Sequence, residues 1–153
     1  MLTLEGRIRE MVHRFKYGGR PQLAGPLIRL CPWLEGQLGP EPVIVPVPLH
    51  RSRRHQRGYN QAELLARFVA TLAGGRCLSG LVRVRDTPAQ VGRSGRERRQ
   101  ALRDSFSWRS DPLSGPVHVL DDVITTGATA LAATAALKRA GADRVDVLGL
   151  ALG

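Results

Sequence analysis

The chain has 153 residues, of which 42% are apolar and 24% are charged. This length suffices for one folded domain with its own core but is short for two, and the charged fraction is ordinary for a globular protein. No stretch approaches the roughly eighteen uninterrupted apolar residues that a membrane-spanning helix needs. Residues 1–10 also lack the apolar centre of a signal peptide. The sequence therefore predicts a single folded domain in the cytoplasm, without a membrane span.

The formal net charge of +10 is concentrated in the middle of the chain. Residues 50–110 contain fourteen arginines and four acidic residues, whereas residues 111–153 contain three basic and five acidic residues. Such a segment predicts a surface that faces a polyanion, whether nucleic acid, a phosphorylated metabolite or pyrophosphate. The competing interpretation is a general bias toward arginine, since the chain has 21 arginines and 2 lysines. A general bias would not gather the charge in one segment.

The two cysteines, Cys31 and Cys77, are far apart and form no C-x-x-C pair. This spacing excludes a zinc ribbon and predicts free, mostly buried thiols in a reducing compartment.

Residues 1–42 predict two helices, over 3–16 and 21–31, followed by a loop over 32–42. The first helix has apolar residues at helical spacing, at Leu4, Ile8, Met11, Val12 and Phe15. We expect this N-terminal helical segment to be separate from a core over residues 43–153.

The core begins with an apolar, proline-bounded run over 43–48 that predicts a buried strand. Further predicted elements, in order, are a loop over 49–60, a helix over 61–72, a strand over 78–84 and a mobile polar loop over 86–100 that runs into a helix near 95–103.

The last forty residues give the clearest pattern. They predict a strand over 117–120, a turn over 121–129, a helix over 130–140 ended by Gly141, and a strand over 144–152. Repeated strand–helix–strand units imply parallel pairing. The predicted fold is thus a single α/β domain with a mainly parallel central sheet flanked by helices.

The turn after the strand over 117–120 has the chemistry of a sugar-phosphate site. Asp121 and Asp122 offer acceptors for vicinal hydroxyls at the carboxyl end of a strand. The residues that follow offer backbone N–H groups, hydroxyl donors and close backbone approach for a phosphate, namely Thr125, Thr126, Gly127, Ala128 and Thr129. The alternative interpretation is a helix cap, a solvated acid and ordinary turn chemistry. The two halves together favour a ribose 5-phosphate site.

The stretch VHVLDDVITTGAT resembles the phosphoribosyl-pyrophosphate (PRPP) motif of type I phosphoribosyltransferases. More narrowly, the chain resembles the competence-associated ComF family. The supporting stretches are FKYGGR at 15–20, VPVPLHRSRRHQRGYNQAELLA at 45–66 and RVRDTPAQ at 83–90. The resemblance implies a type I phosphoribosyltransferase-like fold.

It also implies roles for individual residues. Asp121 and Asp122 would bind the ribose hydroxyls, and residues 125–129 would bind the 5′-phosphate. The loop Pro48, Leu49, His50 and Arg51 would receive pyrophosphate with Mg²⁺, and residues 83–103 would form a flap. Members of the family begin with a cysteine-rich zinc-binding segment, which we expect this chain to lack. In the flap, Arg93 and Ala101 stand where the family usually has Leu and Asn.

Phosphoribosyl transfer builds negative charge on pyrophosphate, so cations near the leaving group are needed. Arg51, Arg83 and Arg85 are the candidate catalytic residues, and no protein-held metal site is expected. The sequence does not name the acceptor, for which a nucleobase is the expected class. Residues 1–42 are the available material for a hood over that acceptor.

Two other functions stay open from the sequence. One is a non-catalytic accessory that binds single-stranded DNA during natural transformation, using Arg51, Arg53, Arg54 and Arg57. The other is a regulator that senses PRPP or a nucleotide. Competence-machinery proteins and a second copy of the chain are candidate partners.

Overall fold

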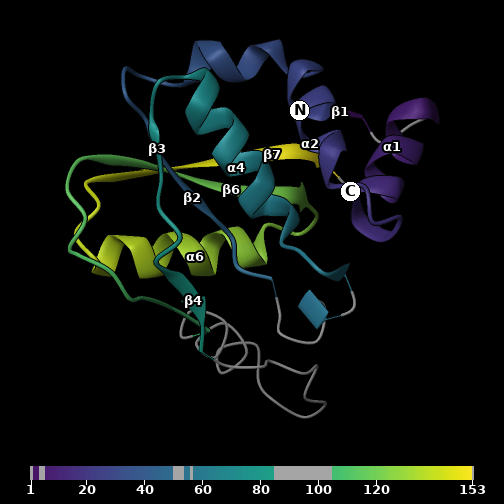
Figure 1. The fold of residues 1–153 in the computed structure, drawn as a ribbon. Coiled ribbons are helices and arrows are strands. Elements are labelled where there is room, and N and C mark those ends of the chain that lie inside the picture. Colours follow the sequence, from purple (N-terminus) through teal and green to yellow (C-terminus); the bar gives the residue numbers. More distant parts are fainter. Residues whose placement is uncertain (1, 4–5, 50–53, 56, 85–104, 153) are drawn as a thin grey trace.

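The computed structural model describes residues 2–3, 6–49, 54–55, 57–84 and 105–152. Its central sheet has five parallel strands in the order β1–β7–β6–β2–β3 (Figure 1). Their bounds are β1 Leu2–Thr3, β2 Val43–Pro46, β3 Arg76–Cys77, β6 Pro116–Ile124 and β7 Arg144–Leu152. The predicted parallel α/β sheet is confirmed.

Helices cover both faces of this sheet. Their bounds are α1 Gly6–Tyr17, α2 Ala24–Arg29, α4 Gln61–Leu72 and α6 Ala128–Arg139, with short 3-10 helices at Pro21–Leu23 and Pro32–Gln37. Helix α4 links β2 to β3, and α6 links β6 to β7 in the opposite direction across the sheet. Because such parallel connections are right-handed, the two helices lie on opposite faces (Figure 1).

The core accordingly has two halves. One joins α1, α2 and α4 to the sheet and includes Phe15, Ile44, Leu65 and Leu120. The other joins α6 to the opposite face and includes Val45, Val117, Val119 and Leu137. Neighbouring residues of β2 and β6 thus enter different halves, as expected for strands that are buried on both faces.

A separate antiparallel pair packs beside α6. Strands β4 (Leu81–Arg83) and β5 (Phe106–Trp108) pair with Arg83 opposite Phe106, and the Val84 amide donates to the Ser105 carbonyl at 2.9 Å. This pair therefore brings together the two ends of residues 85–104. The predicted flap, with its mobile loop and the helix near 95–103, lies almost entirely outside the described residues.

Several predicted elements differ from the structure. The helix over 21–31 is divided into a 3-10 helix at Pro21–Leu23 and α2 at Ala24–Arg29. The helix over 3–16 begins instead at Gly6, because Leu2–Thr3 pairs with the end of β7. The strand predicted over 78–84 is shorter, since β4 covers only Leu81–Arg83, and the sequence prediction missed β3 at Arg76–Cys77, which belongs to the other sheet. The two strands are separated near Gly80, where a Cβ would lie 2.9 Å from the Trp108 ring. Part of the loop over 32–42 is a 3-10 helix.

Other boundaries agree closely. The helix over 61–72 is confirmed as α4, and the strand over 43–48 is β2 with two residues fewer. Among the described residues, no helix is both long and apolar enough to cross a membrane.

Candidate functional site

The candidate site lies where the order of strands reverses. β2 and β6 are neighbours, but the chain leaves them toward opposite edges of the sheet. The Val47 amide donates to the Leu120 carbonyl at 2.9 Å, so the segments that follow the two strands emerge side by side. In open parallel sheets, ligands bind in the crevice at the carboxyl ends of such strands.

Both sequence-predicted loops begin at this end of the sheet. Half-buried Pro48 and Leu49 follow β2, while half-buried Asp121 and Asp122 lie on the last part of β6. β6 continues to Ile124, so the turn predicted over 121–129 was too long at its start. Its acids belong to the strand, which holds their backbone in the sheet.

The two carboxylates are oriented by local hydrogen bonds. The Asp122 amide donates to Asp121 Oδ1 at 2.8 Å, and the Val123 amide donates to Asp122 Oδ1 at 2.8 Å. Neither side chain belongs to the apolar core, since both residues keep part of their surface exposed at the strand end. Each carboxylate keeps lone pairs that can accept a ligand hydroxyl.

Burial and, after it, the neighbouring Asp122 carboxylate raise the pKa of Asp121 to about 7. The Asp122 amide and the Lys16 ammonium act the other way. Perturbed acids in a cleft are characteristic of functional sites, and two adjacent carboxylates in a partly dry setting resist double ionisation.

The start of α6 provides the second half of the site. Gly127 precedes the helix with a φ of +72°, a left-handed conformation that favours glycine, and no side chain caps the helix. The Ala128 amide has only a long contact, 3.5 Å to Thr126 Oγ1. First-turn amides have no partner within the helix, and Thr125 and Thr126 are exposed. The turn can therefore accept an anion at the positive end of the helix.

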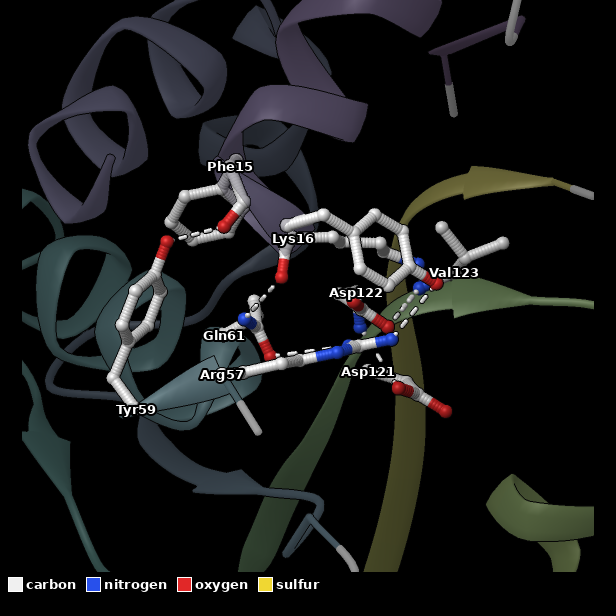
Figure 2. Close-up of polar contacts among 9 residues, drawn as sticks. Phe15, Lys16, Arg57, Tyr59, Gln61, Asp121, Asp122 and Val123 are labelled. Atoms are coloured by element: carbon white, nitrogen blue, oxygen red, sulfur yellow. Dashed lines mark hydrogen bonds and ion pairs between the residues drawn. The ribbon is translucent and has the colours of Figure 1, made fainter. Parts of the chain in front are cut away.

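The N-terminal segment reaches the acid pair directly. Lys16, on the last turn of α1, forms an ion pair with Asp122 at 3.0 Å between Nζ and Oδ2 (Figure 2). Both side chains are largely buried, with 17% and 16% of their surface exposed. The segment predicted as a hood thus contacts the acid pair that is predicted to bind ribose, and its role over an acceptor stays a prediction.

That last turn of α1 is held by residues 57–61. Tyr59 Oη donates to the Phe15 carbonyl, and Gln61 Nε2 donates to the Lys16 carbonyl at 3.4 Å (Figure 2). These carbonyls lie at the end of a helix, where backbone acceptors lack intrahelical partners. The stretches FKYGGR and RGYNQ therefore fold as one unit beside β6.

Arg57 completes this unit. Its Nη2 donates to Tyr17 Oη at 3.0 Å, its Cζ lies 4.6 Å from the centroid of the Tyr17 ring, and its Nη1 donates to Gln61 Oε1 at 3.3 Å. The sequence prediction assigned Arg57 to DNA, but within the described part of the chain its contacts are to the end of α1 and to Gln61.

The remaining predicted residues are only partly described. His50, Arg51, Arg53 and Arg85 lie outside the described residues, so their assigned roles stay predictions. Arg54 is exposed on a helical turn. Arg83 lies on β4 with its guanidinium 5.3 Å from the centroid of the Phe106 ring.

Burial keeps the two cysteines and the buried histidine in their uncharged forms. Burial raises the pKa of Cys31 to about 11 and also raises that of Cys77, so both resist forming thiolates. Both are free, as predicted. His118 is 3% exposed on β6, and burial lowers its pKa.

No group of three or more His, Cys, Asp or Glu side chains suited to a metal occurs in the described ranges. The acid pair offers two carboxylates, and Mg²⁺ is usually bound through one or two carboxylates together with substrate phosphates. These donors are compatible with Mg²⁺ that arrives bound to the phosphate oxygens of a substrate.

Sequence reasoning missed four residues that the structure places beside the acid pair or its supporting unit, namely Lys16, Tyr17, Tyr59 and Gln61. A signal for them was present, since they lie in the two stretches that carried the family resemblance. Nothing in the spacing showed that these stretches contact each other, because about forty residues separate them.

Comparisons with known proteins agree with this arrangement. Competence protein F of Haemophilus influenzae is 39% identical over 112 residues, which cover 71% of this chain and 49% of the relative. The DNA utilization protein YhgH of Salmonella typhi is 34% identical over 148 residues, covering 90% and 63%. The chain therefore spans between about half and just under two thirds of these relatives.

Among solved structures, glutamine PRPP amidotransferase from B. subtilis, complexed with ADP and GMP, superposes with a TM-score of 0.60. It is 21% identical, and the superposition covers 91% of this chain and 30% of the amidotransferase chain. A structure described as the allosteric regulatory enzyme of purine biosynthesis gives 0.55 at 22% identity, with the same shares of the two chains. No model of a protein family matches the chain. The fold is that of the type I phosphoribosyltransferases, and the chain is a homologue of competence protein F and of the YhgH proteins, in agreement with its resemblance to the ComF family.

Proposed function

We propose that the chain binds PRPP and transfers its ribose 5-phosphate to an acceptor nucleophile with release of pyrophosphate. One observation carries the proposal. Two oriented carboxylates, Asp121 and Asp122, lie at the end of β6, a few residues before an uncapped helix that begins at a left-handed Gly127.

This arrangement matches the two ends of a ribose 5-phosphate. The carboxylates accept hydrogen bonds from the vicinal hydroxyls, and the first-turn amides of α6 with Thr125 and Thr126 donate to the phosphate. Binding both ends fixes the sugar so that its C1 faces the loop after β2.

Transfer breaks the bond between C1 and a pyrophosphate oxygen, whose electron pair leaves with pyrophosphate, while the acceptor forms a new bond to C1. Positive charge develops on the sugar and negative charge on the leaving group. Pro48 and Leu49 lead into the loop with His50 and Arg51 that we assign to pyrophosphate, and Mg²⁺ bound to PRPP neutralises part of its charge.

A titration with PRPP and Mg²⁺ tests the binding step. Ligand that binds only the folded state stabilises it by about 2.7 kcal/mol at a hundred times its dissociation constant, which raises the melting temperature. The variant Asp121→Asn/Asp122→Asn keeps the shape of both side chains and removes their charge, so its melting temperature should not respond. A wild type unaffected by millimolar PRPP, or an equal response in the variant, would contradict the proposal.

Turnover is measured separately, as pyrophosphate release with PRPP and a panel of nucleobases as acceptors. Release with one class of base identifies the acceptor. PRPP binding without release across the panel would favour a PRPP-sensing protein over a transferase.

The names of the relatives favour one second candidate, the binding of single-stranded DNA. These relatives are named for competence and for DNA utilization, and Arg54 is an exposed residue soon after Pro48 and Leu49 in the sequence. Neutralising Arg51, Arg53 and Arg54 should weaken binding of an oligonucleotide and flatten its salt dependence, whereas Arg109→Ala, at another exposed arginine, should not. A salt slope unchanged by the triple variant would rule out this loop as the DNA contact.

A further inference from the structure

We propose that Lys16 is a positioning residue of the ribose site: it holds Asp122 in the orientation that accepts the ribose hydroxyls. This inference rests on the proposed function. It assigns to the N-terminal segment a direct part in recognising the sugar.

The first argument is the geometry at Asp122. Lys16 Nζ lies 3.0 Å from Oδ2, and the Val123 amide donates to Oδ1 at 2.8 Å. Each oxygen thus has one fixed donor, so the plane of the carboxylate is set. A carboxylate oxygen has two lone pairs, and one on each oxygen remains for a ligand.

The second argument is that Lys16 itself is fixed. Gln61 donates to its backbone carbonyl at 3.4 Å, and the residues on either side of it, Phe15 and Tyr17, accept from Tyr59 and Arg57. Three consecutive residues of the last turn of α1 are therefore held by one short segment (Figure 2). The backbone from which the flexible Lys16 side chain extends is therefore fixed beside β6.

The third argument is the contrast with other ion pairs. Arg14–Glu10 and Arg67–Glu63 join neighbours on one helix, and in each the arginine is about two-thirds exposed. Lys16–Asp122 differs from these two pairs and from Arg144–Asp146, since both of its side chains are less than a fifth exposed. Exposed pairs contribute little, whereas a desolvated pair at a binding site fixes geometry.

The charge also matters for the neighbouring acid. The Lys16 ammonium lowers the pKa of Asp121, against the effects of burial and of Asp122. Lys16 therefore offsets part of the repulsion between two adjacent carboxylates.

The test is a double-mutant cycle in PRPP affinity, measured by calorimetry with Mg²⁺ present on wild type, Lys16→Met, Asp122→Asn and the double variant. Loss of a hydrogen bond to a charged group predicts that Lys16→Met weakens PRPP binding roughly ten- to a hundredfold. In the Asp122→Asn background the same substitution should cost little more, because its effect passes through Asp122. Lys16→Arg should retain most of the affinity.

Lys138→Met is the matched control. Lys138 is the other lysine of the chain, exposed at the far end of α6, where it donates to the Asp143 carbonyl. The PRPP affinity of the Lys138→Met variant should equal that of wild type. The pH midpoint of PRPP affinity should move upward in Lys16→Met and stay in place in Lys138→Met.

The outcomes separate cleanly. Wild type that does not bind PRPP refutes the proposed function. Two outcomes refute the inference alone when wild type binds PRPP. In one, Lys16→Met binds PRPP as well as wild type does. In the other, the affinity losses of Lys16→Met and Asp122→Asn add independently. If Lys16→Met leaves a buried carboxylate unpaired and fails to fold, the double variant still lacks both charges. In that case, equal PRPP affinity of the double variant and Asp122→Asn, with affinity retained in Lys16→Arg, supports the inference. A lower affinity of the double variant than of Asp122→Asn refutes it.

Discussion

PRPP affinity should depend on pH through Asp121. The hydroxyls of ribose donate hydrogen bonds, so the ionised carboxylate is the better acceptor. Since the pKa of Asp121 is about 7, a substantial fraction of the protein carries the protonated form at neutral pH. Binding should therefore strengthen as the pH rises through that value.

The expected size follows from the fraction of ionised carboxylate. With a pKa of about 7, roughly one molecule in eleven is ionised at about pH 6 and roughly ten in eleven at about pH 8. Affinity scales with the competent fraction, so PRPP should bind about tenfold more tightly at the higher pH.

Stability should change in the opposite direction. The folded state keeps the Asp121 proton up to about pH 7, whereas the unfolded chain releases it near its ordinary value of 3.8. The folded state thus holds more protons between these values, and the free energy of unfolding contributed by this group falls as pH rises through that window. At about 1.4 kcal/mol per pKa unit, the total is a few kcal/mol.

Calorimetry and urea unfolding at matched pH values check both effects, with Asp121→Asn as the test variant. Asp111→Asn, at an exposed acid, is the control. PRPP phosphates titrate near the same pH, and the difference between wild type and Asp121→Asn removes their contribution. An identical pH dependence of PRPP affinity in those two proteins would refute the reasoning.

Three further predictions concern stability, each measured by urea unfolding. Gly127→Ala should cost about 1–2 kcal/mol, because alanine is strained at a φ of +72°, and unchanged stability would show that the turn relaxes freely. Tyr59→Phe should lower the free energy of unfolding by about 1–3 kcal/mol, because the Phe15 carbonyl loses its donor. It should also speed hydrogen exchange in α1, and an exchange rate equal to that of wild type would contradict this. Leu137→Ala should cost about 2–5 kcal/mol because Leu137 is fully buried under the sheet, whereas Leu131→Ala, 71% exposed on the same helix, should cost little; equal costs would contradict the packing.

The longest elements and the acid–threonine turn were predictable from sequence because their determinants are local. Helix α4 has apolar positions at helical spacing, the β2 run is apolar throughout, and residues 117–120 of β6 are apolar except for His118, as is typical of buried parallel strands. Gly127 and the residues around it form a pattern whose chemistry can be read without knowing its neighbours.

Short and tertiary features could not be predicted in the same way. Strands β1 and β5 have two and three residues, too few for a period, and pairing alone defines them. The start of β4 depends on the Trp108 ring that lies against Gly80. Neither influence is visible within a local window.

The sequence by itself determined the parallel α/β class, the carboxylates at the end of a strand and the glycine-led start of α6 that is predicted to bind an anion, since each arises from residues adjacent in the chain. Only the tertiary structure decided that Lys16 pairs with Asp122 and that residues 57–61 hold the end of α1. It also decided the pKa of Asp121, because desolvation and charge depend on what surrounds a group in space. Contacts between segments distant in the chain arise from packing, and packing is a property of the whole fold.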